Sequence, residues 1–405
     1  MPCLNHNLLH LCNCMNYEKI ILKSGRERSL LNRHPWVFSG GVKQMPKAPN
    51  GSIVEVRSNA DELLGYGFFA PNSQIMCRLF EFTSEPMIID ENYWKEKITR
   101  AFNYRKLFIN AETTNIYRLI HAEGDFFPGI IIDIYNQAAV CQILVKGVEL
   151  ISQTIFEALQ SLGFHHIYLK TKQSTQLLEQ VTDGNRWVND AVLPMPIEGK
   201  EYGVKFNINV ETGQKTGFFI DQRENRKTLG ELSKGKTVLN TFSYSGGFSL
   251  FALQNGATWV DSVDSSKEAI ELCNQNVALN GLTNHEGIAA DCFEYLKQCE
   301  KKYDIIVLDP PAFAKHSRAV ANASRGYQSL NKLGIEMVKP NGLVFTFSCS
   351  QHIDKDLFRK IVFSAAAETK RNVRIVRQLS QPDDHPINIY HPEGEYLKGL
   401  LLHVE

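Results

Sequence analysis

Short apolar runs dominate the first part of the chain. Loops that carry glycine and proline, such as residues 46–51, separate these runs. Runs of this length between turn residues are typical of β-strands. The predicted strands are 19–22, 52–57, 63–69 and 75–82. We therefore expect residues 17–85 to form a small β-rich domain.

The middle of the chain, residues 86–200, mixes helical and strand patterns. The pattern predicts a helix around 91–109, strands at 130–135 and 139–145, and a helix near 149–162. A mixed α+β unit accommodates this order.

From about residue 201 the chain alternates between strand and helix patterns. This alternation is the signature of a doubly wound parallel sheet, so residues 201–405 should form an α/β domain. The predicted strands are 237–242, 259–264, 285–290, 303–309, 342–349, 373–378 and 398–404. The predicted helices are 245–255, 267–279, 291–299, 325–338 and 354–369.

The length and composition are those of a multidomain globular protein. A chain of 405 residues is long enough for two or three domains. Apolar residues make up 43% and charged residues 22%, which excludes a disordered or collagen-like chain. The formal net charge is zero, which excludes a uniformly basic nucleic-acid coat protein but not a local basic face.

Such a basic stretch lies between residues 17 and 47. This stretch contains seven basic and two acidic residues, and Trp36 and Phe38 lie within it. Basic side chains with aromatics are typical of phosphate neutralisation combined with base stacking. The alternative is that the two aromatics belong to the core and the charges form a solvated face. The candidate RNA-binding residues are Arg26, Arg28, Arg33 and Trp36.

The cysteines and the first residues indicate a reduced, cytoplasmic protein. Nine cysteines are scattered without a CxxC motif, and no apolar run is long enough to span a membrane. Residues 1–16 contain no Lys or Arg, so we expect a disordered leader rather than a secretory signal. The spacing of His10, Cys12 and Cys14 does not favour a metal site, and we expect none.

Candidate ligand groups follow four successive strands of the C-terminal domain. The first strand leads into a turn containing Gly246, and the next three end at Asp264, Asp291 and Asp309. Open α/β sheets bind ligands at this edge, and glycine allows a close backbone approach. The turn lacks GxGxxG, so the set predicts a nucleoside cofactor without pyrophosphate, best matched by S-adenosylmethionine. The alternative for Asp264 and Asp291 is that each caps the following helix.

Cys349 ends the fifth strand between two serines, at the same edge as Asp309. At a strand end, the pKa of a thiol can be lowered so that it serves as a nucleophile. The C5 position of a cytosine base is a poor nucleophile. A thiolate that adds to C6 converts the ring into an enamine, and this enamine can attack a methyl sulfonium. We expect Asp309 to hydrogen-bond the N3/N4 edge of the base during that addition.

Six sequence runs together carry a resemblance to a known family. They are Ser24–Leu31 with His34–Gly40, Lys215–Arg223, Phe242–Phe248, Asp309-Pro310-Pro311, Thr346–Ser350 and Pro392–Gly399. From about residue 17 the chain resembles the class I S-adenosylmethionine-dependent rRNA large-subunit methyltransferase I family. Members are 23S rRNA cytosine-C5 methyltransferases with an N-terminal PUA domain.

The resemblance implies a PUA domain at 17–85, a mixed central domain at 86–200 and a Rossmann-like methyltransferase domain at 201–405. It implies that Cys349 is the nucleophile, that Asp309 contacts the base, and that Asp264 and Asp291 hold ribose and adenine. The other expected cofactor contacts are Gln222, Phe242, Tyr244, Ser245 and Gly246. The expected partner is 23S rRNA, with no DNA and no membrane; a homodimer stays open.

Two alternatives remain. The Asp-Pro-Pro sequence is similar to the motif of enzymes that methylate exocyclic amino groups of adenine or guanine. That motif places an aromatic residue directly after the prolines, where this chain has Ala312 and only then Phe313. The second alternative is a non-catalytic RNA-binding assembly factor that retains the fold. An intact cofactor edge with Cys349 disfavours it.

Overall fold

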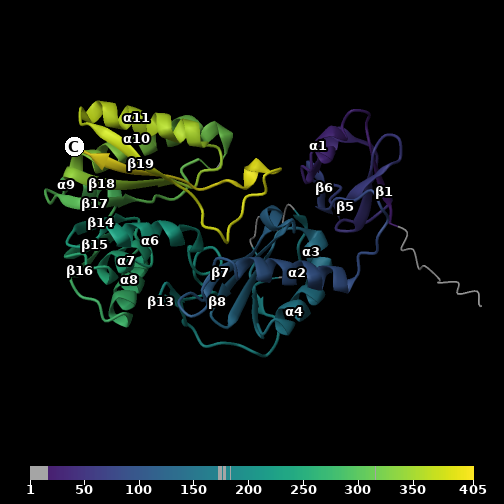
Figure 1. Cartoon of the computed structure of the whole chain (residues 1–405), viewed down its shortest axis with the longest axis horizontal. Coiled ribbons are helices and arrows are strands. Elements are labelled where there is room, and N and C mark those ends of the chain that lie inside the picture. Colours follow the sequence, from purple (N-terminus) through teal and green to yellow (C-terminus); the bar gives the residue numbers. More distant parts are fainter. Residues whose placement is uncertain (1–16, 172–175, 177–178, 183, 315) are drawn as a thin grey trace, which may run out of the picture.

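The computed structural model describes residues 17–171, 176, 179–182, 184–314 and 316–405. The leader expected at 1–16 lies outside the described residues. Figure 1 shows three sheet-containing regions that follow one another along the chain, from the purple N-terminal part through the blue centre to the green and yellow C-terminal part. We refer to their sheets as the N-terminal, central and C-terminal sheets.

The N-terminal sheet has six strands in the order β2-β6-β5-β4-β1-β3. Its elements are β1 (Lys19–Leu22), α1 (Arg28–Leu31), β2 (Trp36–Phe38), β3 (Val42–Gln44), β4 (Ile53–Arg57), β5 (Leu63–Phe69) and β6 (Ile75–Glu81). The β-rich fold expected here is confirmed. Two short strands, β2 and β3, were not predicted, because three residues carry too little periodicity to identify a strand.

The central sheet has five strands in the order β11-β10-β9-β8-β7. Its elements are α2 (Glu91–Arg105), β7 (Ile116–His121), β8 (Ile130–Tyr135), β9 (Ala138–Ile143), α3 (Lys146–Leu150), α4 (Ser152–Ser161), β10 (His166–Leu169) and β11 (Arg186–Trp187). The helix predicted near 149–162 is two helices, because the chain leaves helical geometry at Ile151. Side chains of the N-terminal sheet and of α2, including Phe68 and Trp94, share one apolar core with this sheet.

A two-stranded hairpin, β12 (Ile197–Glu201) and β13 (Val204–Ile208), follows. It leads through residues 209–219 to α6 (Arg223–Leu232). Neither strand nor the helix was predicted. In α6 the buried positions include Arg223, Asn225 and Arg226, so the helix has a polar inner face where a sequence search expects apolar residues.

The C-terminal sheet has seven strands in the order β16-β15-β14-β17-β18-β20-β19. Its strands are β14 (Thr237–Thr241), β15 (Trp259–Asp264), β16 (His285–Ala289), β17 (Tyr303–Leu308), β18 (Val338–Ser348), β19 (Val373–Leu379) and β20 (Lys398–Val404). Its helices are α7 (Gly247–Gln254), α8 (Lys267–Leu279), α9 (Cys292–Gln298), α10 (Val320–Met337) and α11 (Lys355–Thr369). All seven strands match predicted ones, and the α/β class is confirmed.

The predicted parallel sheet contains one antiparallel strand. Six strands run in the same direction, and β20 is antiparallel to both of its neighbours, β18 and β19. The connection between β19 and β20 has no helix long enough for a parallel crossover, so the chain returns as an antiparallel strand.

That connection, residues 380–397, is here named the strap. In Figure 1 it is the yellow segment that leaves the C-terminal sheet, extends toward the blue and purple parts, and returns to β20. Its ends are fixed by two neighbouring strands, so it forms a long excursion anchored at one place.

Among the residues that the structure describes, no helix is both long and apolar enough to cross a membrane.

Candidate active site

The turn after β14 packs tightly against α8. Gly246 has φ +80°, and a Cβ atom built there would lie 2.4 Å from Cys273 Sγ. The Ser245 carbonyl accepts a hydrogen bond from Asn276 Nδ2 at 2.9 Å, which fixes the turn against α8. Ser243 Oγ is buried and has no hydrogen-bond partner among the described residues. A buried hydroxyl without a partner costs stability unless a ligand satisfies it.

Asp264, at the end of β15, holds the same turn from the other side. Its Oδ2 accepts a hydrogen bond from the Tyr244 backbone at 2.9 Å, and its Oδ1 accepts one from the Ser266 backbone at 3.0 Å. Ser266, not Asp264, caps α8. Each carboxylate oxygen can accept a second hydrogen bond, so Asp264 can bind a ligand hydroxyl while keeping both backbone contacts.

Asp291 does cap a helix. Its Oδ1 accepts a hydrogen bond from the Glu294 backbone at 3.0 Å at the start of α9. Its Oδ2 makes no hydrogen bond to the described residues. Next to it, the Phe242 backbone donates to Cys292 Sγ at 3.2 Å, which joins the first turn to α9. The helix-cap alternative therefore accounts for one oxygen of Asp291, and its contact with adenine stays a prediction.

Asp309 follows β17 and is partly exposed. Burial, and then the nearby charge of Asp221, raise the pKa of the Asp309 carboxyl to about 7. Gln222 Nε2 donates to Asp309 Oδ1 at 3.0 Å, and Gln222 Oε1 accepts from Asn225 Nδ2 at 2.6 Å. The structure thus places Gln222 against Asp309. The contact of Gln222 with the cofactor stays a prediction.

Cys349 follows β18, which pairs with β17 in parallel register. Burial, and then the charge of Asp309, raise the pKa of the Cys349 thiol to about 11. This direction is opposite to the lowered pKa that the sequence led us to expect, because the strand end is buried and faces carboxylates. The thiol remains partly exposed at the edge, so a substrate can reach it.

Lys398 faces the same strand end from β20, where it pairs with Ser348. Its ammonium group is buried and donates to the backbone carbonyls of Ser350 and Tyr396, each at 2.7 Å. Burial lowers the pKa of Lys398 to about 8. Its charge lowers the pKa of the Cys349 thiol and partly offsets the effect of Asp309. Sequence reasoning did not single out this residue, although it lies in one of the runs that carry the resemblance.

An ion pair lies beside Asp309 and Cys349. Lys215 Nζ lies 2.7 Å from Asp221 Oδ2, which also accepts from the Tyr396 hydroxyl at 2.8 Å. Burial opposes ionisation of Asp221, but Lys215 and the hydrogen bonds hold the pKa of its carboxyl well below the usual range. Asp221 Oδ1 is buried without a partner among the described residues. Lys215 and Asp221 were also not predicted, although the resemblance run at 215–223 contains both.

The central sheet anchors the loop that carries these residues. Thr216 Oγ1 donates to Asp133 Oδ2 at 2.5 Å and lies 2.7 Å from the Tyr135 hydroxyl. Arg118 pairs with both oxygens of Asp133 at 2.7 and 2.9 Å. A bidentate ion pair of this kind is directional as well as strong, so it fixes the loop beside the candidate site.

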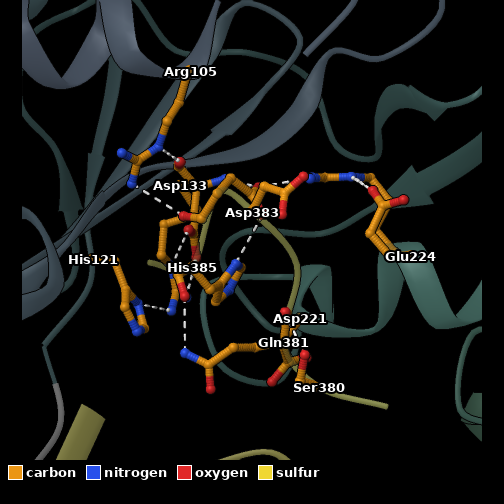
Figure 2. A network of polar contacts seen from close by, with 12 residues as sticks. Arg105, His121, Asp133, Asp221, Glu224, Ser380, Gln381, Asp383 and His385 are labelled. Atoms are coloured by element: carbon orange, nitrogen blue, oxygen red, sulfur yellow. Dashed lines mark hydrogen bonds and ion pairs between the residues drawn. The ribbon is translucent and has the colours of Figure 1, made fainter. Parts of the chain in front are cut away.

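The strap closes the same region from the other side. Asp384 Oδ2 accepts from the Arg118 backbone at 2.8 Å and from Arg223 Nη1 at 2.7 Å, all three residues being buried. The Asp384 carbonyl accepts from Arg105 Nη2 at 3.0 Å. Figure 2 shows how Arg105 and Asp133 of the central region converge on the strap residues around His385. We name the buried residues Arg105, Arg118, Asp133, Arg223 and Asp384 the junction cluster.

The candidate RNA-binding residues lie on the N-terminal region. Arg26, Arg28 and Arg33 are exposed. Trp36 is half-buried, and its Nε1 donates to Glu123 Oε1 at 2.9 Å. Its ring lies edge-on to that of His391 at 4.4 Å, so the indole packs between the N-terminal sheet and the strap.

The site residues fit S-adenosylmethionine. The unpartnered Ser243 hydroxyl and the spare acceptor capacity of Asp264 lie around one turn. Asp264 would hold ribose hydroxyls, and Asp291 Oδ2 is free for an amino group. Within the described ranges, no group of histidine, cysteine or acidic side chains could hold a metal ion.

Two family descriptions match the chain. Residues 20–82 match a PUA-like domain, and residues 187–402 match an S-adenosylmethionine-dependent methyltransferase. The second match spans the hairpin β12–β13, the candidate site and the strap.

Curated relatives are similar over nearly their whole length. Ribosomal RNA large subunit methyltransferase I of Shewanella denitrificans is 40% identical, with 95% of this chain and 99% of the relative covered. The protein of the same name from Aeromonas salmonicida is 38% identical, with 95% and 98% covered. A solved structure of a methyltransferase in complex with SAH is 26% identical, with a TM-score of 0.83 and 95% and 100% covered.

Proposed function

The chain belongs to the ribosomal RNA large subunit methyltransferase I family of S-adenosylmethionine-dependent enzymes, and we propose that it forms 5-methylcytosine in 23S rRNA through a covalent Cys349–cytosine adduct. The observation that supports this product is the pairing of β17 and β18, which brings Asp309 and Cys349 to one edge beside the cofactor turn. A thiol beside a titratable acid is the equipment that C5 methylation needs.

The reaction begins when the Cys349 thiolate adds to C6 of the cytosine. A C–S bond forms, and the electron pair of the C5–C6 double bond becomes available at C5 as an enamine. When bound, S-adenosylmethionine would supply an electrophilic methyl group on a sulfonium, with the neutral thioether as the leaving group when the S–CH3 bond breaks. After C5 is methylated, its proton passes to a base, the C5–C6 double bond reforms and the C–S bond breaks. Cys349 leaves as a thiolate, ready for another cycle.

Asp309 assists the addition step by its protonation state. Because its pKa is about 7, both the acid and the carboxylate are populated near neutral pH. The acid can donate a hydrogen bond to N3 while charge develops on the ring, and the carboxylate can accept from the N4 amino group. Gln222 orients Asp309 through the 3.0 Å hydrogen bond described above.

Cys349 must lose its proton before it can attack. Lys215 and Lys398 both lower the pKa of its thiol, against the opposing effects of burial, Asp309 and Asp221. Protonation of Asp309 removes one of the two opposing negative charges. The same proton that prepares Asp309 to donate therefore also favours the thiolate.

The position of the transferred methyl group on the RNA base tests the proposal. Purified protein is incubated with rRNA and S-adenosylmethionine labelled on the methyl group, and the modified nucleoside is identified. We expect the label on cytosine C5. Label on an exocyclic amine would support the alternative suggested by Asp309-Pro310-Pro311, and an unlabelled RNA would support a non-catalytic binding factor.

In this proposal the N-terminal region supplies the affinity for RNA. The protein acts on rRNA in the cytoplasm. We expect neutralisation of Arg26, Arg28 and Arg33 to weaken rRNA binding and to reduce the salt dependence by roughly 0.7–0.9 log units per lost phosphate contact. Affinity for the cofactor should not change.

A matched variant neutralises Arg325, Arg359 and Lys360, which are exposed on α10 and α11. It removes the same formal charge from the C-terminal region and should leave the salt slope close to that of the unaltered protein. Equal slopes for the two triple variants would refute a docking role for the N-terminal arginines.

A further inference from the structure

The strap connects the candidate active site to the N-terminal region. At one end, the Tyr396 hydroxyl donates to Asp221 beside Cys349. Farther along, His391 packs edge-on against Trp36, with ring centroids 4.4 Å apart. The strap therefore spans the distance between the region that carries the basic stretch and the candidate active site.

The strap is held firmly where it meets the central and N-terminal regions. Asn388 and His391 are buried, and Asn388 Nδ2 donates to the carbonyl of Glu123 in the central region at 3.2 Å. The His391 backbone donates to the Asn388 carbonyl at 2.8 Å, and the Tyr390 backbone donates to Asn388 Oδ1 at 3.0 Å. The turn formed by 388–391 is therefore fixed by its own hydrogen bonds and by its inward-facing residues.

The two residues between these anchors point outward. Ile389 is 84% exposed and Tyr390 is 42% exposed. Two neighbouring exposed apolar side chains on an otherwise anchored loop offer a surface on which a ligand can pack.

Arg33 stands beside this outward face. Its guanidinium carbon lies 5.8 Å from the centre of the Tyr390 ring and 5.0 Å from that of Phe82. The guanidinium is exposed and belongs to the 17–47 stretch with its excess of basic residues. An apolar face, an aromatic ring and an arginine together suit an anionic chain with flat bases.

We propose that Ile389, Tyr390 and Arg33 form a stacking platform for an unpaired nucleotide of the RNA that flanks the methylated base. The choice of RNA as the ligand rests on the proposed function. The nucleotide base packs on Tyr390 and Ile389, while Arg33 contacts its phosphate. Single-stranded RNA is favoured over duplex RNA because only an unstacked base can present its face to the platform.

Binding titrations with a fluorescent probe test the platform. The probe is a short, unstructured oligoribonucleotide of uridine and cytidine, used alone and annealed to its complement, without methyl donor. The Ile389→Ala/Tyr390→Ala variant should bind the single strand roughly tenfold more weakly, which is the scale of losing a stacked base. Its affinity for the duplex should stay close to that of the unaltered protein.

Two controls isolate stacking from other effects. Tyr390→Phe keeps the ring and should bind the single strand normally. Phe363→Ala removes a more exposed aromatic side chain from α11, outside the strap, and should also have no effect. Equal thermal midpoints for all variants show that the fold is intact.

Three results would overturn the platform: no binding of the single strand by the unaltered protein, no loss in the double variant, or an equal loss for single strand and duplex. A change of oligomeric state in the double variant with unchanged RNA affinity would assign the patch to contacts between copies of the chain. These titrations need no catalysis. A wrong assignment of Cys349 or of the product would leave their outcome unaffected.

Discussion

Two charged regions of the molecule lie close together and differ in how well their polar groups are satisfied. At the cofactor edge, the Ser243 hydroxyl and Asp221 Oδ1 are buried without partners, and the pKa of Asp309 is raised to about 7. In the junction cluster, Arg118 pairs bidentately with Asp133, and Arg223 pairs with Asp384. The edge is partly exposed and leaves polar groups without partners, whereas the junction cluster is buried and its charges are paired.

The difference separates groups that await a ligand from groups that hold the fold. Hydrogen bonds that the protein leaves unmade at the edge can be made to a cofactor or a base, and a shifted pKa there serves proton transfer. The junction cluster leaves no such capacity, and breaking one of its pairs would strand a charge in the interior. Substitutions in the two regions should therefore change different measurements.

The largest expected effect is at the edge. Cys349→Ala should reduce methyl transfer by several orders of magnitude, because the proposed covalent bond to C6 can no longer form. Binding of S-adenosylmethionine and the free energy of unfolding should change little. Cys299→Ala, which alters another partly exposed thiol, is the control. Near-normal turnover by Cys349→Ala would contradict its role as the nucleophile, and with it the assignment of the edge to catalysis and of the junction cluster to stability.

The next effect concerns the junction cluster. Asp384→Asn should lower the free energy of unfolding by about 3–5 kcal/mol, because the buried Arg223 charge loses its buried partner and keeps only the more exposed Glu224. Denaturant titration measures this loss. Asp356→Asn, on an exposed side chain of α11, should cost almost nothing.

The pH dependence of this variant sharpens the test. Burial opposes ionisation of Asp384, but Arg223 and His385 hold the pKa of its carboxyl well below the usual range. A carboxyl with a depressed pKa contributes stability above its unfolded pKa of about 3.9, and that contribution is lost as the pH falls below it. The difference between the unaltered protein and Asp384→Asn should thus be full near neutral pH and shrink below about pH 4. A pH-independent difference would mean that the carboxylate charge is not the cause.

A smaller effect is expected for cofactor binding. Asp264→Ala should weaken S-adenosylmethionine binding at least about tenfold, through lost hydrogen bonds to the ribose and a loosened turn at Tyr244. Calorimetry measures the affinity. Asp90→Ala removes the N-cap of α2, far along the chain from the edge, and should leave the affinity unchanged. An equal affinity for both variants would reduce Asp264 to a structural role.

The smallest effect has an unusual sign. Asp309→Asn should abolish its assistance to methyl transfer and yet make Cys349 more reactive toward iodoacetamide. The Asp309 carboxylate raises the pKa of the thiol, so its removal should increase the thiolate fraction several-fold below the thiol pKa of about 11. The alkylation rate of the Cys349 peptide, followed by mass spectrometry against pH, measures this. Asp304→Asn, at the opposite end of β17, is the control, and a rate equal to that control would contradict the electrostatic assignment.

The sequence predicted much more of the edge than of the junction. Strand ends that carry Gly246, Asp264 and Cys349 are local features, since a parallel sheet brings successive strand ends together. The direction of the Cys349 pKa was not predicted, because it depends first on the burial of the strand end and then on the charges of Asp309 and Asp221.

The junction cluster left no local pattern to recognise. Arg105 and Asp384 are 279 positions apart, and Arg223 lies in a helix whose inner face is polar. Lys398 was also missed, since its pairing with Ser348 depends on the antiparallel return of β20. Contacts between distant polar residues follow from the strap, whose path a periodicity analysis does not reveal.

The strap also dictates the order in which the molecule can be completed during synthesis. Chains emerge from the ribosome from the N-terminus, and domains generally fold as they appear. The central region, with Arg105 and Arg118, is made long before Asp384, its partner across more than 260 positions. Until Asp384 is made, the Arg105 guanidinium lacks the Asp384 carbonyl, and the Arg118 backbone N–H lacks the Asp384 carboxylate. The nascent enzyme therefore acquires its closed catalytic architecture in one late step, when the strap is released and β20 completes the sheet.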